Sequence, residues 1–281
     1  MPEGPEVRRE ADALALAIGG RPLVRVDYRV RGLASRARRL EGARATRVWS
    51  RGKALLIAFD RGLVHYSHNQ LYGRWRVVDA SAEPEPGRTV RVVLATKRRA
   101  AILYSATEVA LLEPPELDEH PFLARLGPDV LDRSTTPARV AGRLAEPRFA
   151  RTTLGHLLLD QGFVAGLGNY LRSDVLHAAG LRASDRPCDL DAGAIAGLAR
   201  AIVALPRRSY RTGGITNEPR REERLAACGM PFEGRRFLVY AREGEPCWTC
   251  GTTIRRDDAA GRGWYLCPTC QPVRRRRTRA A

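Results

Sequence analysis

The sequence predicts an α+β protein with more than one domain. Runs of β pattern fill residues from about 23 to 112, a helical pattern dominates from about 137 to 205, and two Cys-x-x-Cys pairs lie near the end of the chain. At 281 residues the chain is long enough to give each of two domains its own hydrophobic core. We therefore expect a β domain, a helical domain and a small cysteine-based module.

Residues 1–6 read Met-Pro-Glu-Gly-Pro-Glu and come directly before a predicted amphipathic helix. Pro5 suits the first helical turn, where a missing N–H costs nothing. Apolar residues then recur at helical spacing, and a Gly-Gly pair ends the run. They are Val7, Ala11, Leu14 and Ile18, followed by Gly19 and Gly20.

Removal of Met1, which a small following residue favours, would make Pro2 a free secondary amine. An α-amino group has a pKa of about 7.7–8.0, so part of it is uncharged near neutral pH. Such an amine could attack a sugar C1′ atom and form an iminium, and Glu3 could move the protons that this needs. The alternative is an ordinary chain start followed by an amphipathic helix.

The β pattern consists of many short runs separated by Gly, Asp or basic turn residues. Alternation over residues 24–30 sets apolar positions against charged ones, and many such strands at close spacing indicate a sandwich or a barrel. The further runs are 44–49, 54–59, 63–67, 74–78, 90–95 and 100–104.

A linker rich in proline is expected over 113–136, and a Thr136-Pro137 pair then opens the helical part. The expected helices are 137–145, 153–160, 169–179 and 191–204. The Gly-rich turn before Asn169 could let backbone N–H groups approach a phosphate, with Asn169 as a helix cap, or it could be a plain interhelical turn. Residues 211–230 are expected to form a mobile loop.

The net charge of +17 and the pI of about 10.6 indicate a polyanionic partner, with nucleic acid first and an anionic membrane second. The alternative is a basic protein with an unrelated role. No apolar run reaches the roughly 18 residues of a membrane span. Since the first residues are acidic rather than basic and apolar, a signal peptide is not expected, and a cytoplasmic location is.

Only two of the 48 basic residues are lysines, Lys53 and Lys97. Lysine carries a compact ammonium that can lose its proton, whereas arginine stays charged. Lys53 follows Arg51-Gly52 between two β runs and is expected at a tight turn; the alternative is an ordinary surface lysine. Lys97 is expected in a solvated turn.

The two Cys-x-x-Cys pairs have the spacing of a zinc ribbon. Residues 251–266 separate the pairs, and four thiolates would complete a closed, structural tetrahedral site. The ligands would be Cys247, Cys250, Cys267 and Cys270. Two disulfides are the alternative. Strands are expected at 252–254 and 264–266, with Arg262 in the loop between them, and Cys188 and Cys228 are expected to be plain thiols.

Together these motifs resemble, in order and over nearly the whole chain, the bacterial formamidopyrimidine-DNA glycosylase and endonuclease VIII family of base-excision repair. The endonuclease VIII branch is the better match because Gly4 and the contiguous Gln70-Leu71-Tyr72 are typical of it. The motifs are Pro2-Glu3-Gly4-Pro5-Glu6, Arg51-Gly52-Lys53, Ser67-His68-Asn69-Gln70-Leu71-Tyr72-Gly73, His120-Pro121-Phe122-Leu123, Gly166-Leu167-Gly168-Asn169-Tyr170 and the Cys-Pro-Thr-Cys-Gln zinc finger at 267–271.

The resemblance implies an N-terminal β-sandwich that carries the catalytic helix, and a helix-two-turns-helix domain with a zinc hairpin. The implied division of the chain is a catalytic domain 1–125, a linker 126–136, a DNA-binding domain 137–240, a zinc finger 241–271 and a disordered basic tail 272–281.

The resemblance also implies residue roles. Pro2 would be the Schiff-base nucleophile and Glu3 a proton donor, while Lys53 and Arg262 would assist β- and δ-elimination. The DNA contacts would be Gln70, Leu71, Tyr72, Arg125 and Asn169. Asp174 stands where the family commonly has glutamate, in a region that could approach an extruded base.

The implied function is a bifunctional glycosylase and AP lyase for oxidised pyrimidines in double-stranded DNA, acting as a monomer with one structural zinc ion and no organic cofactor. Membrane binding is not expected. The alternatives are an 8-oxoguanine and formamidopyrimidine glycosylase of the same family, or a damage-binding protein without catalysis.

Overall fold

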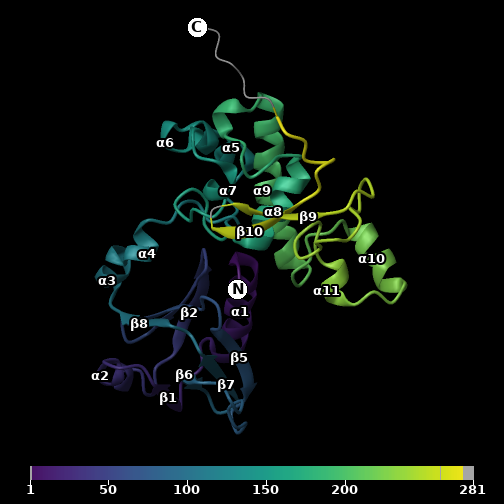
Figure 1. Cartoon of the computed structure of the whole chain (residues 1–281). Helices are drawn as coiled ribbons and strands as arrows, with labels where there is room; N and C mark the ends of the chain where they lie inside the picture. Colours follow the sequence, from purple (N-terminus) through teal and green to yellow (C-terminus); the bar gives the residue numbers. More distant parts are fainter. Residues whose placement is uncertain (1, 260, 275–281) are drawn as a thin grey trace. The chain divides into compact units, whose positions relative to one another are not determined.

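The computed structural model describes residues 2–259 and 261–274, which form two compact units, Met1–Arg125 and Leu126–Ala281. Figure 1 traces each unit along the chain. The initiator residue and most of the tail expected from 272 onward lie outside the described residues.

Unit 1 contains two antiparallel sheets of four described strands each. The strand orders are β2-β3-β4-β8 and β1-β6-β7-β5. The bounds are β1 Arg25–Tyr28, β2 Ala45–Arg51, β3 Ala54–Phe59, β4 Val64–His68, β5 Arg74–Asp79, β6 Val90–Ala95, β7 Arg99–Tyr104 and β8 Glu108–Leu112. All but β8 coincide closely with the predicted β runs.

One hydrophobic core joins both sheets of unit 1 to the first helix, α1 (Gly4–Ile18). Ile57 of the first sheet and Leu94 of the second lie in the same buried cluster as Leu14 of α1. The predicted β-sandwich with an N-terminal helix is therefore confirmed. A short helix α2 (Ala34–Arg38) follows β1.

The first part of the expected linker is helical, so that prediction is wrong between 113 and 125. Helix α3 (Pro114–Glu119) begins with a capping box of Glu113 and Glu116, and α4 (Pro121–Ala124) follows at once. The prolines lie in first helical turns, where they start helices rather than interrupt them.

Unit 2 is helical around a second core. Its helices are α5 Pro137–Ala145, α6 Pro147–Ala150, α7 Leu154–Leu157, α8 Asn169–Ala179, the 3₁₀ helix η1 Pro187–Asp189, α9 Ala192–Arg211, α10 Pro219–Ala227 and α11 Phe232–Arg235. Thr136 caps α5 as predicted, because its side chain accepts from the Arg139 N–H at 3.2 Å. The expected helix 153–160 shrinks to one turn, and α9 runs on through Pro206 to Arg211.

The expectation of a loop over 211–230 is wrong. Helix α10 occupies much of this segment, and the Glu218 side chain caps it by accepting from the backbone N–H groups of Arg220 and Arg221. Thr216 and Asn217 at its base are fully buried. The segment is anchored to unit 2 at that point.

The chain closes with a hairpin of β9 (Arg255–Ala259) and β10 (Arg262–Leu266). The first strand lies three residues later than predicted, since Ile254 is buried beside Cys247 and Cys267 instead of pairing with β10. In the described part of the chain, no helix is both long enough and apolar enough to cross a bilayer.

Candidate catalytic, DNA-contact and metal sites

Pro2 and Glu3 lie at the start of α1. Glu3 is the N-cap and only 3% exposed, and its backbone N–H donates to Glu6 Oε2 at 3.0 Å in a capping box. Pro2 is half-buried just before this cap. The positive end of the helix dipole therefore lies next to the predicted nucleophile and its proton donor.

Lys53 lies at the turn between β2 and β3, where Gly52 adopts a φ of 60°. The side chain is 8% exposed, so Lys53 is not an ordinary solvated surface lysine. Burial, and secondarily the positive charge of Lys53, lowers the pKa of His68 to about 4, which keeps that imidazole neutral at physiological pH.

The loop between β4 and β5 exposes two large side chains, Leu71 at 54% and Tyr72 at 70%. Gln70 adopts a left-handed backbone with a φ of 48°, and the Gly73 N–H donates to the Asn69 carbonyl at 2.8 Å. A Cβ atom on Gly73 would come within 2.6 Å of that carbonyl oxygen, so only glycine fits there. The loop thus projects an apolar tip from a tightly closed base.

Arg125 ends α4 and is exposed, with its guanidinium carbon 5.7 Å from the Phe122 ring centroid. Phe122 in turn packs edge-on against His68, at 5.0 Å between ring centroids. Arg125 and His68, the histidine near Lys53, therefore both pack against the Phe122 ring.

Asn169 is the first residue of α8, and it does not cap that helix as predicted. Gly168 is the N-cap, while the Asn169 Nδ2 group donates to the Gly263 carbonyl at 2.9 Å and its Oδ1 accepts from Arg172 at 2.7 Å. The side chain thus joins the Gly-rich turn to the zinc hairpin.

Arg172 was missed by the sequence reasoning. It is fully buried, and its guanidinium donates to the carbonyls of Gly155 at 3.2 Å and Arg262 at 3.1 Å. The only local signal is its position three residues after Asn169, on the same face of α8. With its carbonyl held in this way, Arg262 leaves its side chain exposed at the start of β10.

Asp174 is fully buried, so it does not offer a free carboxylate to a base. Its Oδ1 accepts from the backbone N–H groups of Val239 at 2.9 Å and Tyr240 at 3.1 Å. Its Oδ2 accepts from Leu238 N–H at 3.0 Å and from the Thr216 hydroxyl. The carboxylate fastens α8 to the chain on both sides of α10 and α11.

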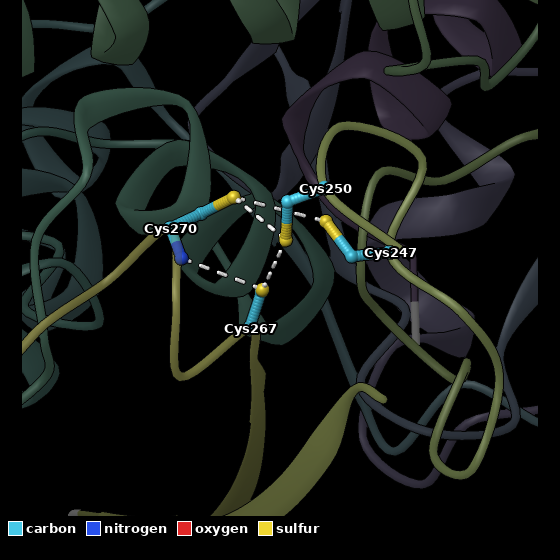
Figure 2. A group of neighbouring side chains, drawn as sticks. All are labelled: Cys247, Cys250, Cys267 and Cys270. Atoms are coloured by element: carbon cyan, nitrogen blue, oxygen red, sulfur yellow. Dashed lines mark hydrogen bonds between the residues drawn. The ribbon is translucent and has the colours of Figure 1, made fainter. Parts of the chain in front are cut away.

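The four predicted metal ligands converge, as Figure 2 shows. All four Sγ atoms lie within 4.8 Å of one another. The Sγ separations are 3.4 Å for Cys250–Cys267, 3.5 Å for Cys250–Cys270 and 3.9 Å for Cys247–Cys270. Tetrahedral zinc with bonds of about 2.3 Å requires sulfur separations of about 3.8 Å, so the four residues fit the ion.

Local hydrogen bonds favour the thiolate form of Cys250, whereas burial raises the pKa values of Cys267 and Cys270. Backbone N–H groups of Thr249 and Cys270 each lie 3.4 Å from a cysteine sulfur, and hydrogen bonds from Thr252 lower the pKa of Cys250 to about 6. His177 Nε2 of α8 lies 3.6 Å from Cys247 Sγ. Cys188 and Cys228 are exposed and lie outside this cluster, as predicted for plain thiols.

Two family models match this chain, one in each of the two units. Residues 1–108 match the formamidopyrimidine-DNA glycosylase N-terminal domain, and residues 244–273 match the zinc finger found in FPG and IleRS. Endonuclease 8 of Escherichia coli O17:K52:H18 is 47% identical over 271 residues, covering 96% of this chain and 100% of the relative. Endonuclease 8 of Shigella sonnei is 46% identical over the same shares of each chain.

The chain belongs to the formamidopyrimidine-DNA glycosylase and endonuclease 8 family.

Solved structures of this family share the fold. Lactococcus lactis Fpg in complex with DNA containing an abasic site has a TM-score of 0.81 at 22% identity, covering 96% of this chain and 100% of that one. A complex of the same protein with DNA containing an oxidised pyrimidine also has a TM-score of 0.81 at 22% identity, with 97% and 100% covered. The family consists of DNA glycosylases with AP lyase activity, so this chain is a DNA-repair glycosylase with a structural zinc finger.

The predicted site residues divide between the two units. Unit 1 carries Pro2, Glu3, Lys53, Gln70, Leu71, Tyr72 and Arg125, and unit 2 carries Asn169, Arg262 and the four cysteines. Within unit 2, hydrogen bonds to the carbonyls of Arg262 and Gly263 bring the hairpin to Asn169. The roles of these side chains stay predictions.

Proposed function

We propose that this protein removes oxidised pyrimidines, such as thymine glycol and dihydrouracil, from double-stranded DNA through a Schiff base on Pro2, and then cuts the strand by β,δ-elimination. The observation that carries this proposal is the start of α1. There the capping box holds a buried Glu3 directly beside Pro2, at the positive end of the helix.

Access to the sugar comes first. A base inside a duplex shields its own C1′ atom, so it must be extruded, at a cost of a few kcal/mol that is smaller for a damaged base. Leu71 and Tyr72 are the exposed apolar side chains that would fill the vacated stack, and Gln70 and Arg125 would contact the DNA beside them. Asn169 and the Arg262 side chain would bind the backbone from unit 2.

In the chemical step the Pro2 nitrogen forms a bond to C1′, and the damaged base leaves with the electron pair of the glycosidic bond and accepts a proton. Glu3 protonates the ring oxygen O4′, which opens the sugar and yields the iminium. The iminium acidifies the C2′ hydrogen. Loss of that proton expels the 3′ phosphate, with Lys53 as the proton donor, and a second elimination assisted by Arg262 expels the 5′ phosphate.

The zinc ion, when bound, supplies cross-linking of the hairpin and takes no part in the reaction. Cys247, Cys250, Cys267 and Cys270 would hold it in a closed shell with no open coordination position. The partner is damaged DNA, as it is for the L. lactis Fpg structures, and the +17 charge supports a polyanionic partner. We further propose a monomer acting in the bacterial cytoplasm, where the DNA lies.

The pyrimidine preference is supported by the contiguous Gln70-Leu71-Tyr72 and by the endonuclease 8 relatives. It is tested by borohydride trapping of tag-free protein on one duplex with dihydrouracil and one with 8-oxoguanine opposite cytosine. We expect a covalent complex with dihydrouracil, which an N-terminal extension that blocks Pro2 abolishes. Trapping mainly on 8-oxoguanine would refute the pyrimidine preference but not the nucleophile.

A matched lysine pair tests the elimination step. Lys53→Gln changes a buried lysine, whereas Lys97→Gln changes the exposed one. We expect Lys53→Gln to slow strand cleavage at an abasic site by at least 100-fold, and Lys97→Gln to leave it within twofold. Equal cleavage rates for both variants would remove Lys53 from the elimination step. The absence of a trapped complex on every substrate, with DNA binding intact, would leave a damage-binding protein.

A further inference from the structure

Glu10 of α1 contacts both ends of the loop that carries Leu71 and Tyr72. Its Oε2 atom accepts a hydrogen bond from Asn69 Nδ2 at 2.6 Å, and its carboxylate also accepts from the backbone N–H of Trp75. Asn69 is the first residue after β4, and Trp75 is the second residue of β5. One carboxylate therefore ties the entry and the exit of the loop to the helix.

Burial and hydrogen bonds fix the backbone at both ends of this loop. Asn69 is 3% exposed, its carbonyl accepts from Gly73 N–H, and the Trp75 indole donates to Ser67 Oγ at 3.2 Å. Between Asn69 and Gly73 only three residues remain, of which Gln70 holds a left-handed backbone. The positions of Leu71 and Tyr72 relative to α1 thus depend on the contact between Asn69 and Glu10.

Glu10 lies seven residues, or about two turns, after Glu3 on the same helix. The helix that presents the predicted nucleophile at its start is therefore the helix that holds the predicted wedge. We propose that Glu10 is a positioning residue that sets the wedge loop, Asn69–Gly73, at a fixed place relative to Pro2 and Glu3. This inference rests on the proposed function, in which Leu71 and Tyr72 fill the space of the extruded base.

The charge of Glu10 makes this role measurable. Burial raises the pKa of Glu10 to about 7, against the opposing effect of the hydrogen bonds from Asn69 and Trp75. Glu6, one turn earlier on α1, raises the pKa further, and Arg74 on β5 lowers it. The ionised carboxylate offers acceptors to both anchors, whereas the protonated form turns one oxygen into a donor.

Protonation would therefore loosen one end of the wedge loop. The Asn69 Nδ2 and Trp75 N–H groups are both donors, so neither can accept the new proton. A glutamine at position 10 has one carbonyl oxygen and one NH₂ group, and it mimics the protonated carboxyl at every pH. Wild type below pH 6 and Glu10→Gln at any pH should consequently behave alike.

The test uses the full-length protein and a duplex that contains a tetrahydrofuran abasic analogue opposite 2-aminopurine. The analogue cannot form a Schiff base, so the fluorescence change reports loop insertion without chemistry. At pH 8 we expect Glu10→Gln to bind this duplex about tenfold more weakly than wild type, the size expected for the loss of one charge-assisted hydrogen bond. Binding to undamaged duplex should stay within twofold.

The pH profile separates positioning from a general loss of structure. The ratio of wild-type to Glu10→Gln affinity should fall from about ten at pH 8 to about one at pH 5.5, with its midpoint near 7. Asp12→Asn is the matched control, since Asp12 is a more exposed carboxylate of α1 that pairs with Arg8 at 3.0 Å. It should change neither the affinity nor the profile.

A double variant tests whether Glu10 acts through the loop. In a Leu71→Ala background the Glu10→Gln substitution should cost less than threefold in affinity, because the wedge that it positions is truncated. A flat ratio of one across the pH range, or full additivity with Leu71→Ala, would overturn the proposal. Borohydride trapping of the same samples on a natural abasic site tests the proposed function separately, because it depends on Pro2 and not on the fluorescence readout.

Discussion

Replacing Asp174 by asparagine should destabilise unit 2 strongly. The carboxylate uses both oxygens, with Oδ1 accepting from Val239 and Tyr240 and Oδ2 accepting from Leu238 and Thr216. Asparagine can keep one pair of these bonds, but its NH₂ group must face the other pair. In a fully buried site no water is at hand to satisfy the donors that lose their acceptor.

The expected loss of stability follows from the number of hydrogen bonds that the asparagine cannot make. At least one backbone N–H remains buried and unsatisfied, at about 1–3 kcal/mol, and the retained bonds lose the strengthening that an ionised acceptor gives. We expect a loss of about 3 kcal/mol in the free energy of unfolding of unit 2. For a unit of roughly 150 residues this corresponds to a fall of about 6–12 °C in its melting temperature.

Differential scanning calorimetry measures the effect, with Glu233→Gln as the control. Glu233 also forms hydrogen bonds with a neighbour, Arg236 at 3.0 Å, but its side chain is 75% exposed. The control should shift the melting temperature by less than about 2 °C, since exposed ion pairs contribute little. If Asp174→Asn melts within 2 °C of wild type, the carboxylate does not hold the segment around α10 in place.

Three further outcomes are expected. Cys250→Ser should bind less zinc and lose at least tenfold in DNA affinity, because thiolate ligation is part of the folding of the hairpin; normal zinc content by atomic absorption and normal binding would contradict this. Burial lowers the pKa of His65 to about 3, so stability should be lost as pH falls from about 6.5 to 3, at up to about 1.4 kcal/mol per pH unit. His65→Gln, which still offers the Tyr28 hydroxyl a partner, should flatten this slope in acid unfolding curves. Log affinity for duplex DNA should fall linearly with log salt, by about 0.9 per neutralised phosphate, and a flat response would separate the +17 charge from DNA binding.

Elements defined by local signals were predictable from the sequence. Helix α8 matches its predicted bounds because Gly168 and Gly180 flank it, the latter with a φ of 64°. The zinc ligands were predictable for a similar reason, since the Cys-x-x-Cys spacing is itself the geometry of a metal knuckle.

Elements that depend on partners far away in the sequence were not predictable. Strand β8 lacks a clear alternation and exists because it pairs with β4, some forty residues earlier in the chain. The anchoring of the segment around α10 depends on Asp174, which no pattern in residues 211–230 reveals. The cap at Glu218-Pro219 was by contrast a visible signal that was overlooked in an arginine-rich stretch.

The links from α8 to the hairpin also bear on how metal supply affects repair. Asn169 and Arg172 both donate to carbonyls of β10, so the Gly-rich turn and the hairpin are ordered by the same few hydrogen bonds. Zinc shortage would therefore affect more than the hairpin. The turn at the start of α8 would lose its hydrogen-bond partners on β10 as well. We expect the zinc-free protein to bind DNA more weakly, because both elements are predicted to contact the DNA backbone. Lesions would then accumulate although the protein is present.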